Sequence, residues 1–237
     1  MFEPSEFFIF LHKPVYQFDE KRIENPLIVA IKLYLVFILF IGLFNLLNII
    51  TIKQFITLPS DHTFTLSIYH KEHLWIYFFL IGIFSPIMEE IIFRLPLVFN
   101  PTNISLSIST LIALIVRKMS SSISYSILLF VLLFILTYFL SVKYKTYLLS
   151  FWNKNFKYIF YAFSLSFGLA HISNYEFIAA SQYFIAPILI FPQLVMGFIS
   201  SFTRMLYKNG FLICILFHCL LNSITVSVFL IQYINNS

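Results

Sequence analysis

Three charged side chains stand near the middle of a long apolar run, in the stretch SPIMEEIIFRLPLVF at residues 85–99. A charge at the centre of a bilayer costs at least about 2.5 kcal/mol, so such groups usually face the interior of a helical bundle and have partners. Glu90 and Arg94 are four residues apart with the acid first, a spacing that predicts an ion pair on one helix face. Glu89 points about 100° away from Glu90 and needs a partner from another helix.

Two histidines and one asparagine in other apolar runs can supply that partner. His171 stands in SLSFGLAHISN, and His218 stands in ILFHCLLNS with Asn222 four residues later. At this spacing, His218 and Asn222 share one helix face. Glu89 and these three residues each lie within about three residues of the middle of their own apolar run. The sequence therefore predicts that four polar groups from three helices meet at one depth.

Carboxylate, imidazole and amide groups at one depth could activate a water molecule and stabilise an oxyanion. A carboxylate beside an imidazole can act as a general base, and imidazole and amide N–H groups can donate to developing negative charge. Two histidines with a carboxylate also match the ligand set of a catalytic zinc. A single intramembrane histidine or asparagine more often joins helices. The combination favours a functional site, because each such group is costly to bury.

The same residues form three ordered motifs: EEIIFR at Glu89–Arg94, FGLAH at Phe167–His171 and HCLLN at His218–Asn222. They resemble the EExxxR, FxxxH and HxxxN motifs of the CPBP intramembrane protease family, which includes CAAX prenyl endopeptidases and bacteriocin-processing and immunity relatives. The resemblance covers residues 74–231. It implies an endopeptidase that hydrolyses a peptide bond of a membrane-associated protein or peptide.

The resemblance also implies roles for the catalytic residues. Glu89 and His171 would activate the attacking water, and His218 and Asn222 would donate hydrogen bonds to the oxyanion. Glu89, His171 and His218 would be the ligands if a zinc ion is bound. A water activated by the glutamate needs no metal, and we favour that version of the mechanism.

Three further residues would support the site. Glu90 and Arg94 would hold the first motif helix, and Phe167 would wall the site. Leu95 departs from the family pattern, which often has glycine after the arginine. The link between the first two motifs is also longer than usual, because it holds two apolar runs between residues 104 and 140. An even number of inserted helices would preserve the antiparallel arrangement.

Other candidate ligands have simpler interpretations. Cys214 and Cys219 lie on different faces of one apolar run, so we expect buried thiols rather than a disulfide. Cys214 could add a ligand in the zinc version. His70 and His73 have a spacing that could bind a metal, but they are interpreted as residues of a solvated loop.

The elements that must position these residues are membrane helices. The 237-residue chain is 60% hydrophobic and 11% charged, which is more apolar surface than a water-soluble core of this size can bury. Because about 20 apolar residues span a bilayer, we predict an all-α polytopic transmembrane helical bundle with about seven (six to eight) membrane helices. The expected spans are Leu33–Ile50, Leu74–Phe99, Ile104–Val116, Ile123–Leu140, Tyr158–Ala180, Gln182–Phe202 and Phe211–Ile231. Ile104–Val116 is short enough to be re-entrant or interfacial instead.

The expected organisation is a tail followed by one domain. Residues 1–27 contain Glu3 and Glu6 and lack the basic start of a signal peptide, so they are expected to form a cytoplasmic tail. Residues 28–237 form a single transmembrane domain with its motif-bearing core at 74–231. The expected inner segments hold nine Lys and Arg residues against four in the outer loops, which places the amino terminus in the cytoplasm. The net charge of +5 reflects these loops, so nucleic acid is not an expected partner.

Two other functions stay open. A non-catalytic membrane protein, such as an immunity factor, could use the same cavity to bind a peptide. A proton-coupled transporter could use buried glutamate and histidine as a relay, although five glycines in the chain do not favour its broken helices. The short chain and its Phe, Ile and Lys bias are typical of a bacterial plasma-membrane protein, for which a secreted peptide or bacteriocin precursor would be the substrate. The sequence predicts no oligomeric state.

Overall fold

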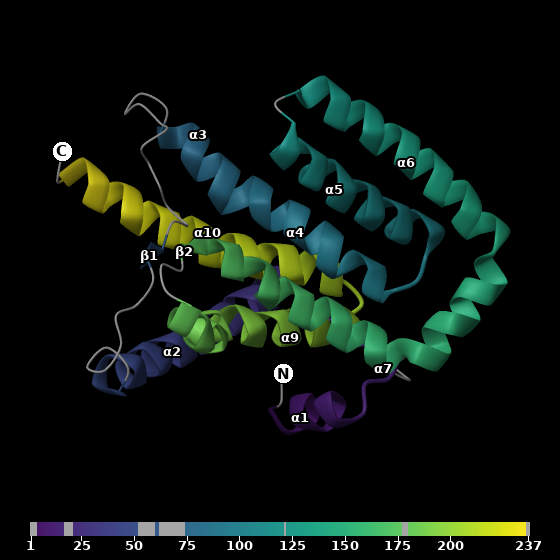
Figure 1. Cartoon of the computed structure of the whole chain (residues 1–237). Coiled ribbons are helices and arrows are strands. Elements are labelled where there is room, and N and C mark those ends of the chain that lie inside the picture. Colours follow the sequence, from purple (N-terminus) through teal and green to yellow (C-terminus); the bar gives the residue numbers. More distant parts are fainter. Residues whose placement is uncertain are drawn as a thin grey trace.

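The computed structural model describes residues 4–16, 21–51, 60–61, 74–120, 122–176 and 180–235, and most of them are helical (Figure 1). The α-helices are α1 (Pro4–His12), α2 (Pro26–Thr51), α3 (Leu74–Phe79), α4 (Ser85–Phe93), α5 (Pro101–Met119), α6 (Ile123–Lys143), α7 (Lys145–Ala170), α8 (Ala186–Leu189), α9 (Phe191–Leu206) and α10 (Gly210–Asn235). A π-helical turn, Leu80–Phe84, joins α3 to α4, and 3-10 turns cover Leu95–Leu97, His171–Asn174 and Ala180–Ile185. The strands β1 (Ser60–Asp61) and β2 (Tyr175–Glu176) form one short antiparallel pair.

Six helical segments within the described residues are long and apolar enough to cross a membrane. They are Pro26–Leu46, Leu74–Leu97, Pro101–Met119, Ile123–Lys143, Gln182–Leu206 and Gly210–Asn235. The prediction of an all-α polytopic membrane bundle is therefore confirmed, at the lower end of the expected number of helices. The run Ile104–Val116 is part of the longer helix α5, which starts at Pro101 because the Asn100 side chain accepts a hydrogen bond from the Thr102 amide.

The expected span Tyr158–Ala180 is wrong in its bounds. α7 begins thirteen residues earlier, at Lys145, and ends at Ala170, and it is not among the six segments apolar enough to span. Lys154 and Lys157 lie in its first half and lower its hydropathy. At the other end of α7, the Ser173 hydroxyl donates a hydrogen bond to the Ala170 carbonyl. A side chain then satisfies this carbonyl in place of a backbone amide of another helical turn, so the helix can end here.

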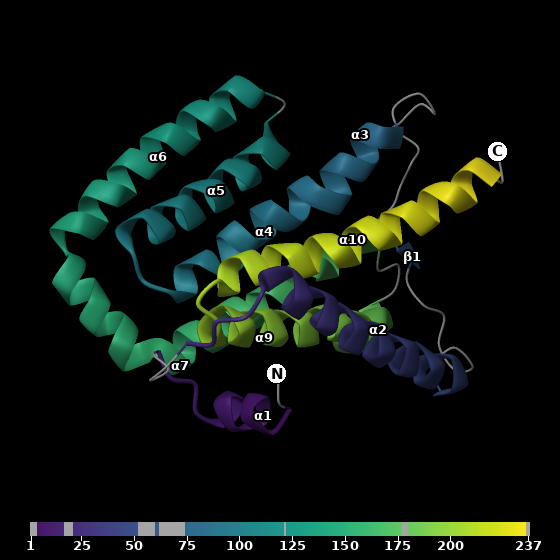
Figure 2. The ribbon, with the colours of Figure 1, turned by 180° about the vertical axis from the view of Figure 1, so that it is seen from behind.

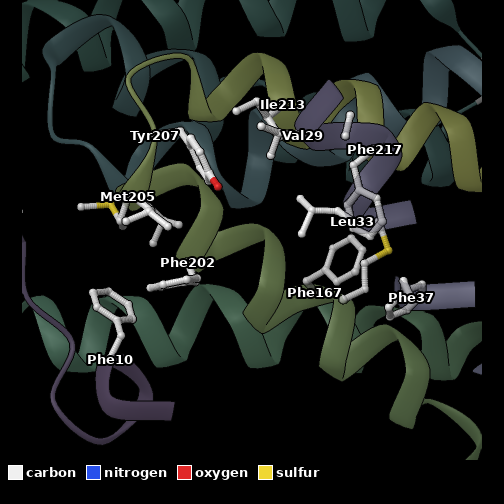
Figure 3. Close-up of a cluster of buried hydrophobic side chains, with 14 of the residues drawn as sticks. Phe10, Val29, Leu33, Phe37, Phe167, Phe202, Met205, Tyr207, Ile213 and Phe217 are labelled. Carbon is white, nitrogen blue, oxygen red and sulfur yellow. The ribbon is translucent and has the colours of Figure 1, made fainter. Parts of the chain in front are cut away.

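Helix α10 is the centre of the bundle. α2, α4 and α9 pack around it, and α7 packs against α9 and α4 (Figures 1 and 2). The main apolar cluster joins α1, α2, α7, α9 and α10 (Figure 3). Phe10 of α1 meets Phe160 and Phe202 at centroid distances of 5.1 Å, and Phe37 of α2 meets Phe217 of α10 edge to face at 5.7 Å. Because lipid is as apolar as these side chains, such contacts hold the helices by van der Waals packing.

Glycines bring α7 and α9 into close contact. A Cβ at Gly197 of α9 would lie 2.5 Å from the Ser164 carbonyl oxygen, and one at Gly168 of α7 would lie 2.5 Å from Leu194 Cδ2. The Ser164 and Ser201 hydroxyls also form a hydrogen bond of 2.9 Å across this contact. Small residues allow such close approach between membrane helices. The contact fixes the end of α7, where His171 follows.

Helices α5 and α6 form a hairpin that packs mainly on itself, beside α4 (Figure 1). Only 6% of the most apolar stretch of α6 is buried. The Ser107 hydroxyl of α5 donates to the Ile92 carbonyl of α4 at 2.8 Å and attaches the hairpin to the bundle. The chain thus leaves the bundle after α4 and returns to it with α7.

Candidate active site

Glu89 lies on α4 between two imidazoles that come from different helices. Its Oε2 is 3.8 Å from His171 Nε2 and 3.8 Å from His218 Nε2. Its other oxygen, Oε1, accepts a hydrogen bond of 2.8 Å from the Ser85 hydroxyl one turn earlier. Oε2 has no hydrogen-bond partner in the part of the chain that the structure describes. The Ser85 contact thus turns Oε2 toward the two histidines.

The hydrogen bonds of the two rings determine which nitrogen carries a proton. His171 Nδ1 is 2.8 Å from the Phe167 carbonyl oxygen, and His218 Nδ1 is 2.8 Å from Glu90 Oε1. A carbonyl and a carboxylate only accept, so each Nδ1 must donate. In the neutral ring, each Nε2 therefore presents a lone pair to Glu89. An Nε2–H group requires the doubly protonated ring.

Glu90 and Arg94 form the ion pair that their spacing predicts, and Glu90 also reaches another helix. Glu90 Oε2 is 3.5 Å from Arg94 Nε, and both side chains are fully buried. Oε1 of the same carboxylate binds His218 on α10. The sequence did not indicate this second bond, although the two groups lie at similar depth in their runs. Glu90 thus connects the first motif to the third.

Phe167 lies behind the imidazoles rather than on the open side of the site. Its side chain is completely buried, with ring centroids 4.9 Å from His171 and 5.7 Å from His218. The Arg94 guanidinium lies 3.8 Å from the centre of the same ring. No Arg94 side-chain nitrogen forms a hydrogen bond with the described residues, so the aromatic face and Glu90 provide its neutralisation. Phe93 lines the open side instead.

Asn222 lies one turn after His218 on α10. Its side-chain amide binds the π-helical turn that precedes α4. Asn222 Nδ2 donates to the Ile81 carbonyl at 3.2 Å. An amide nitrogen has two N–H groups, so one remains for another acceptor. Asn222 also lines the cavity described below, where that second group could serve.

The four predicted catalytic residues all line one cavity of about 710 Å³. This size lies within the usual range for small-molecule and peptide sites, about 300–1,000 Å³. One wall is apolar and comes from α2, α9 and α10: Phe37, Ile38, Ile41, Met196 and Leu221. Polar residues around the end of α7 and the start of α9 line another part: Ser173, Asn174, Tyr175 and Gln193. The cavity therefore suits a bound peptide segment, because its polar wall can contact the peptide backbone and its apolar wall can contact apolar side chains.

The carboxylate and imidazole atoms stand slightly farther apart than the ligands of one zinc ion. Tetrahedral zinc with bonds of about 2.0–2.2 Å holds its ligand atoms about 3.4 Å apart. Glu89 Oε2 is 3.8 Å from each Nε2. Among the described residues, no group of three or more His, Cys, Asp and Glu side chains is arranged to hold a metal.

The other candidate ligands lie elsewhere. Cys214 Sγ donates to the Ser200 carbonyl at 3.1 Å, away from the residues that line the cavity. Cys214 and Cys219 are both free thiols, as expected, but only Cys214 is buried and Cys219 is half-buried. His70 and His73 lie outside the described residues.

Comparison of the chain with protein-family models, with curated proteins and with solved structures found no match.

Proposed function

We propose that this membrane protein is an intramembrane endopeptidase of the CPBP type. Its substrate is a membrane-associated protein or peptide. The observation that supports this function best is the position of Glu89 Oε2, 3.8 Å from both imidazole Nε2 atoms. The same carboxylate lines a cavity of about 710 Å³ that has an apolar wall. A general base between two imidazoles, next to space for a peptide, is suited to hydrolysis.

Glu89 and His171 activate the water in this mechanism. The water donates one hydrogen bond to Glu89 Oε2 and one to His171 Nε2, whose lone pair is free because Nδ1 donates to the Phe167 carbonyl. Glu89 removes a proton as the water oxygen attacks the peptide carbonyl carbon. The same carboxyl group then gives that proton to the leaving amine nitrogen as the C–N bond breaks.

His218 and Asn222 stabilise the oxyanion of the tetrahedral intermediate. Asn222 donates through the N–H that Ile81 does not use. His218 donates through Nε2–H, with its Nδ1 bound to the Glu90 carboxylate; this step requires the doubly protonated ring. Removal of one such donor in other hydrolases costs about 2.7–4 kcal/mol of transition-state stabilisation.

The basic residues support a cytoplasmic amino terminus. The Arg22 amide donates to the Leu206 carbonyl and the Arg22 carbonyl accepts from the Lys208 amide, each at 3.0 Å. The segment before α2 and the turn between α9 and α10 therefore lie at the same end of the bundle. Lys143 and Lys145, at the junction of α6 and α7, extend the Lys and Arg bias that is typical of cytoplasmic segments. We place the protein in a bacterial plasma membrane, with a secreted peptide or bacteriocin precursor as its substrate.

The test compares peptides secreted by cells that lack the protein with those of cells that express it. Wild type, Glu89→Gln and His218→Ala are expressed at matched levels, and Thr137→Val on α6 is the control outside the site. Mass spectrometry should show a precursor that accumulates in both site variants and is processed by wild type and Thr137→Val. Full processing by Glu89→Gln would overturn the proposal. Rescue of a growth or immunity phenotype by both variants without any processing would support the non-catalytic binding protein.

A chelator tests the choice of a metal-free mechanism. Purified protein in lipid nanodiscs should cleave the identified peptide equally well before and after dialysis against EDTA. Loss of cleavage that zinc restores would assign Glu89, His171 and His218 to a metal site.

A further inference from the structure

The π-helical turn before α4 is an unusual element of the motif helix. Leu80–Phe84 forms this turn, and the Ser85 amide closes it by donating to the Leu80 carbonyl five residues earlier. π turns are rare and occur frequently at functional sites. This one lies directly before the segment that holds Ser85 and Glu89. Its extra residue also sets the rotation of α3 relative to α4.

Side chains of α10 bind consecutive carbonyls of the π turn. Asn222 Nδ2 donates to the Ile81 carbonyl at 3.2 Å, and the Ser223 hydroxyl donates to the Gly82 carbonyl at 3.1 Å. The Cys219 thiol lies 3.8 Å from the Ile83 carbonyl. A carbonyl oxygen has two lone pairs and can accept from a side chain as well as from the backbone. The turn is thus attached to the helix that carries the third motif.

Glycine allows the turn to approach α10 this closely. A Cβ at Gly82 would lie 3.0 Å from Ser223 Oγ and 3.2 Å from Ser223 Cα. The Cα cannot rotate away as a side chain could, so a larger residue at position 82 must push the turn and α10 apart. The bond between Asn222 and Ile81 depends on this short separation.

The Ile81 carbonyl determines which end of the Asn222 amide faces it. A carbonyl only accepts, so the group opposite must be the NH₂ and not Oδ1. An amide held in this way keeps its second N–H for an oxyanion. A freely rotating amide could present Oδ1 instead, which would repel the negative charge. The hydrogen bond therefore selects the useful orientation before substrate arrives.

We infer that the π turn is a positioning element for Asn222, in which the Ile81 carbonyl orients the amide and Gly82 and Ser223 hold the turn against α10. The inference rests on the proposed function, because it assigns Asn222 the role of oxyanion donor. It predicts that Gly82 and Ser223 affect catalysis only through Asn222.

Kinetics of paired variants test this dependence, with the peptide identified by the secretion experiment as substrate. Asn222→Ala should lower kcat by about 10²–10³-fold. Gly82→Ala should lower kcat by about tenfold or more with KM little changed, because transition-state binding is lost. The double variant should be no slower than Asn222→Ala alone. An additive loss in the double variant would overturn the inference, since a purely structural defect would act independently of Asn222.

Ser223→Ala provides a milder change if Gly82→Ala does not fold. It removes the bond to the Gly82 carbonyl without adding bulk, and kcat should fall several-fold. Ser227→Ala is the matched control, because the Ser227 hydroxyl lies one turn later on α10 and donates to the Ser223 carbonyl of its own helix at 2.8 Å. Equal effects of the two serine variants on kcat would contradict the inference.

A spectroscopic measurement separates this inference from the proposed function. Protein with isotope-labelled asparagine in nanodiscs should show an Asn222 side-chain NH₂ signal that exchanges slowly with water, identified by its loss in Asn222→Ala. The exchange should become fast in Ser223→Ala and stay slow in Ser227→Ala. If the Asn222 NH₂ group exchanges slowly but no cleavage depends on Glu89, the proposed protease function is overturned and the positioning of Asn222 is not. If the Asn222 NH₂ group exchanges as slowly in Ser223→Ala as in wild type, the positioning role is overturned even where peptide cleavage depends on Glu89.

Discussion

The motif-bearing bundle and the α5–α6 hairpin use polar side chains in opposite ways. In the bundle, Glu90 of α4 binds His218 of α10, and Asn222 of α10 binds the turn before α4. In the hairpin, the Ser107 hydroxyl bonds to α4, but the Ser109 hydroxyl donates to the Ser105 carbonyl and the Thr137 hydroxyl to the Leu133 carbonyl, each within its own helix. A bond within one helix satisfies a polar group in lipid but positions nothing else. A bond between helices fixes their rotation and depth.

The two regions also differ in their small residues. Gly82, Gly168 and Gly197 each stand where a neighbouring helix approaches too closely for a larger side chain. Residues 101–143, which include the hairpin, contain no glycine. The small residues that α5 buries are instead serines and an alanine: Ser105, Ser107, Ser109 and Ala113.

The largest difference between variants of the two regions is expected in the rate of peptide cleavage. Glu89→Gln should lower the rate of peptide cleavage by about 10²–10⁴-fold, because it removes the general base and keeps the shape of the side chain. The amount of folded protein, measured by size-exclusion chromatography in detergent, should not change. Equal cleavage by Glu89→Gln and the hairpin variant Thr137→Val would remove the distinction between the regions.

Arg94→Ala should have the largest effect on stability. It leaves Glu90 as a buried acid without its cation, and breaking a buried pair in this way costs about 3–5 kcal/mol. Folded yield and thermal stability in detergent should both fall. Arg117→Ala at the end of α5 is the matched control, because the Arg117 guanidinium is exposed and donates to the Ser120 carbonyl. Similar losses for both arginine variants would contradict the buried role of Arg94.

Gly197→Ala should have an intermediate effect. Its Cβ would lie 2.5 Å from the Ser164 carbonyl oxygen, so α7 and α9 must separate, at a cost of about 1–3 kcal/mol. Cleavage should fall as well, because the end of α7 carries His171. Gly42→Ala on α2 is the control, since no described atom lies within 4 Å of the added Cβ. A stability of Gly197→Ala equal to that of Gly42→Ala, by thermal unfolding, would show that the close contact is not required.

Thr137→Val should have the smallest effect. The side chain keeps its shape, and the lost hydrogen bond lies within α6. A change within about 0.5 kcal/mol is expected, as for most exposed positions. Thermal unfolding in nanodiscs measures this change. A loss as large as that of Gly197→Ala would show that Thr137 contributes to packing between helices.

Local spacing explains what could be predicted about the site. The Glu90–Arg94 pair follows from the four-residue separation, which helix geometry converts into a shared face. Adjacent residues of a helix point in different directions. Glu89 therefore cannot share the helix face of Glu90 and Arg94, and it needs a partner from another helix. The end of α7 at Ala170 was missed because apolar residues resume at Phe177, after the polar stretch HISNYE that follows the helix. The placement of Phe167 behind the imidazoles was missed because no spacing along α7 shows which neighbour its ring meets.

The sequence by itself determined that the helices are surrounded by lipid and which residues share a face of each helix. Apolar runs of membrane length require lipid, and residues four apart in a helix share a face whatever surrounds them. Only the tertiary structure decided that Glu90 binds His218 and that the Ile81 carbonyl orients Asn222. These contacts depend on how far each helix is rotated and displaced against its neighbours. That relation is set by glycine contacts, aromatic packing and one π turn, which combine residues far apart in the chain.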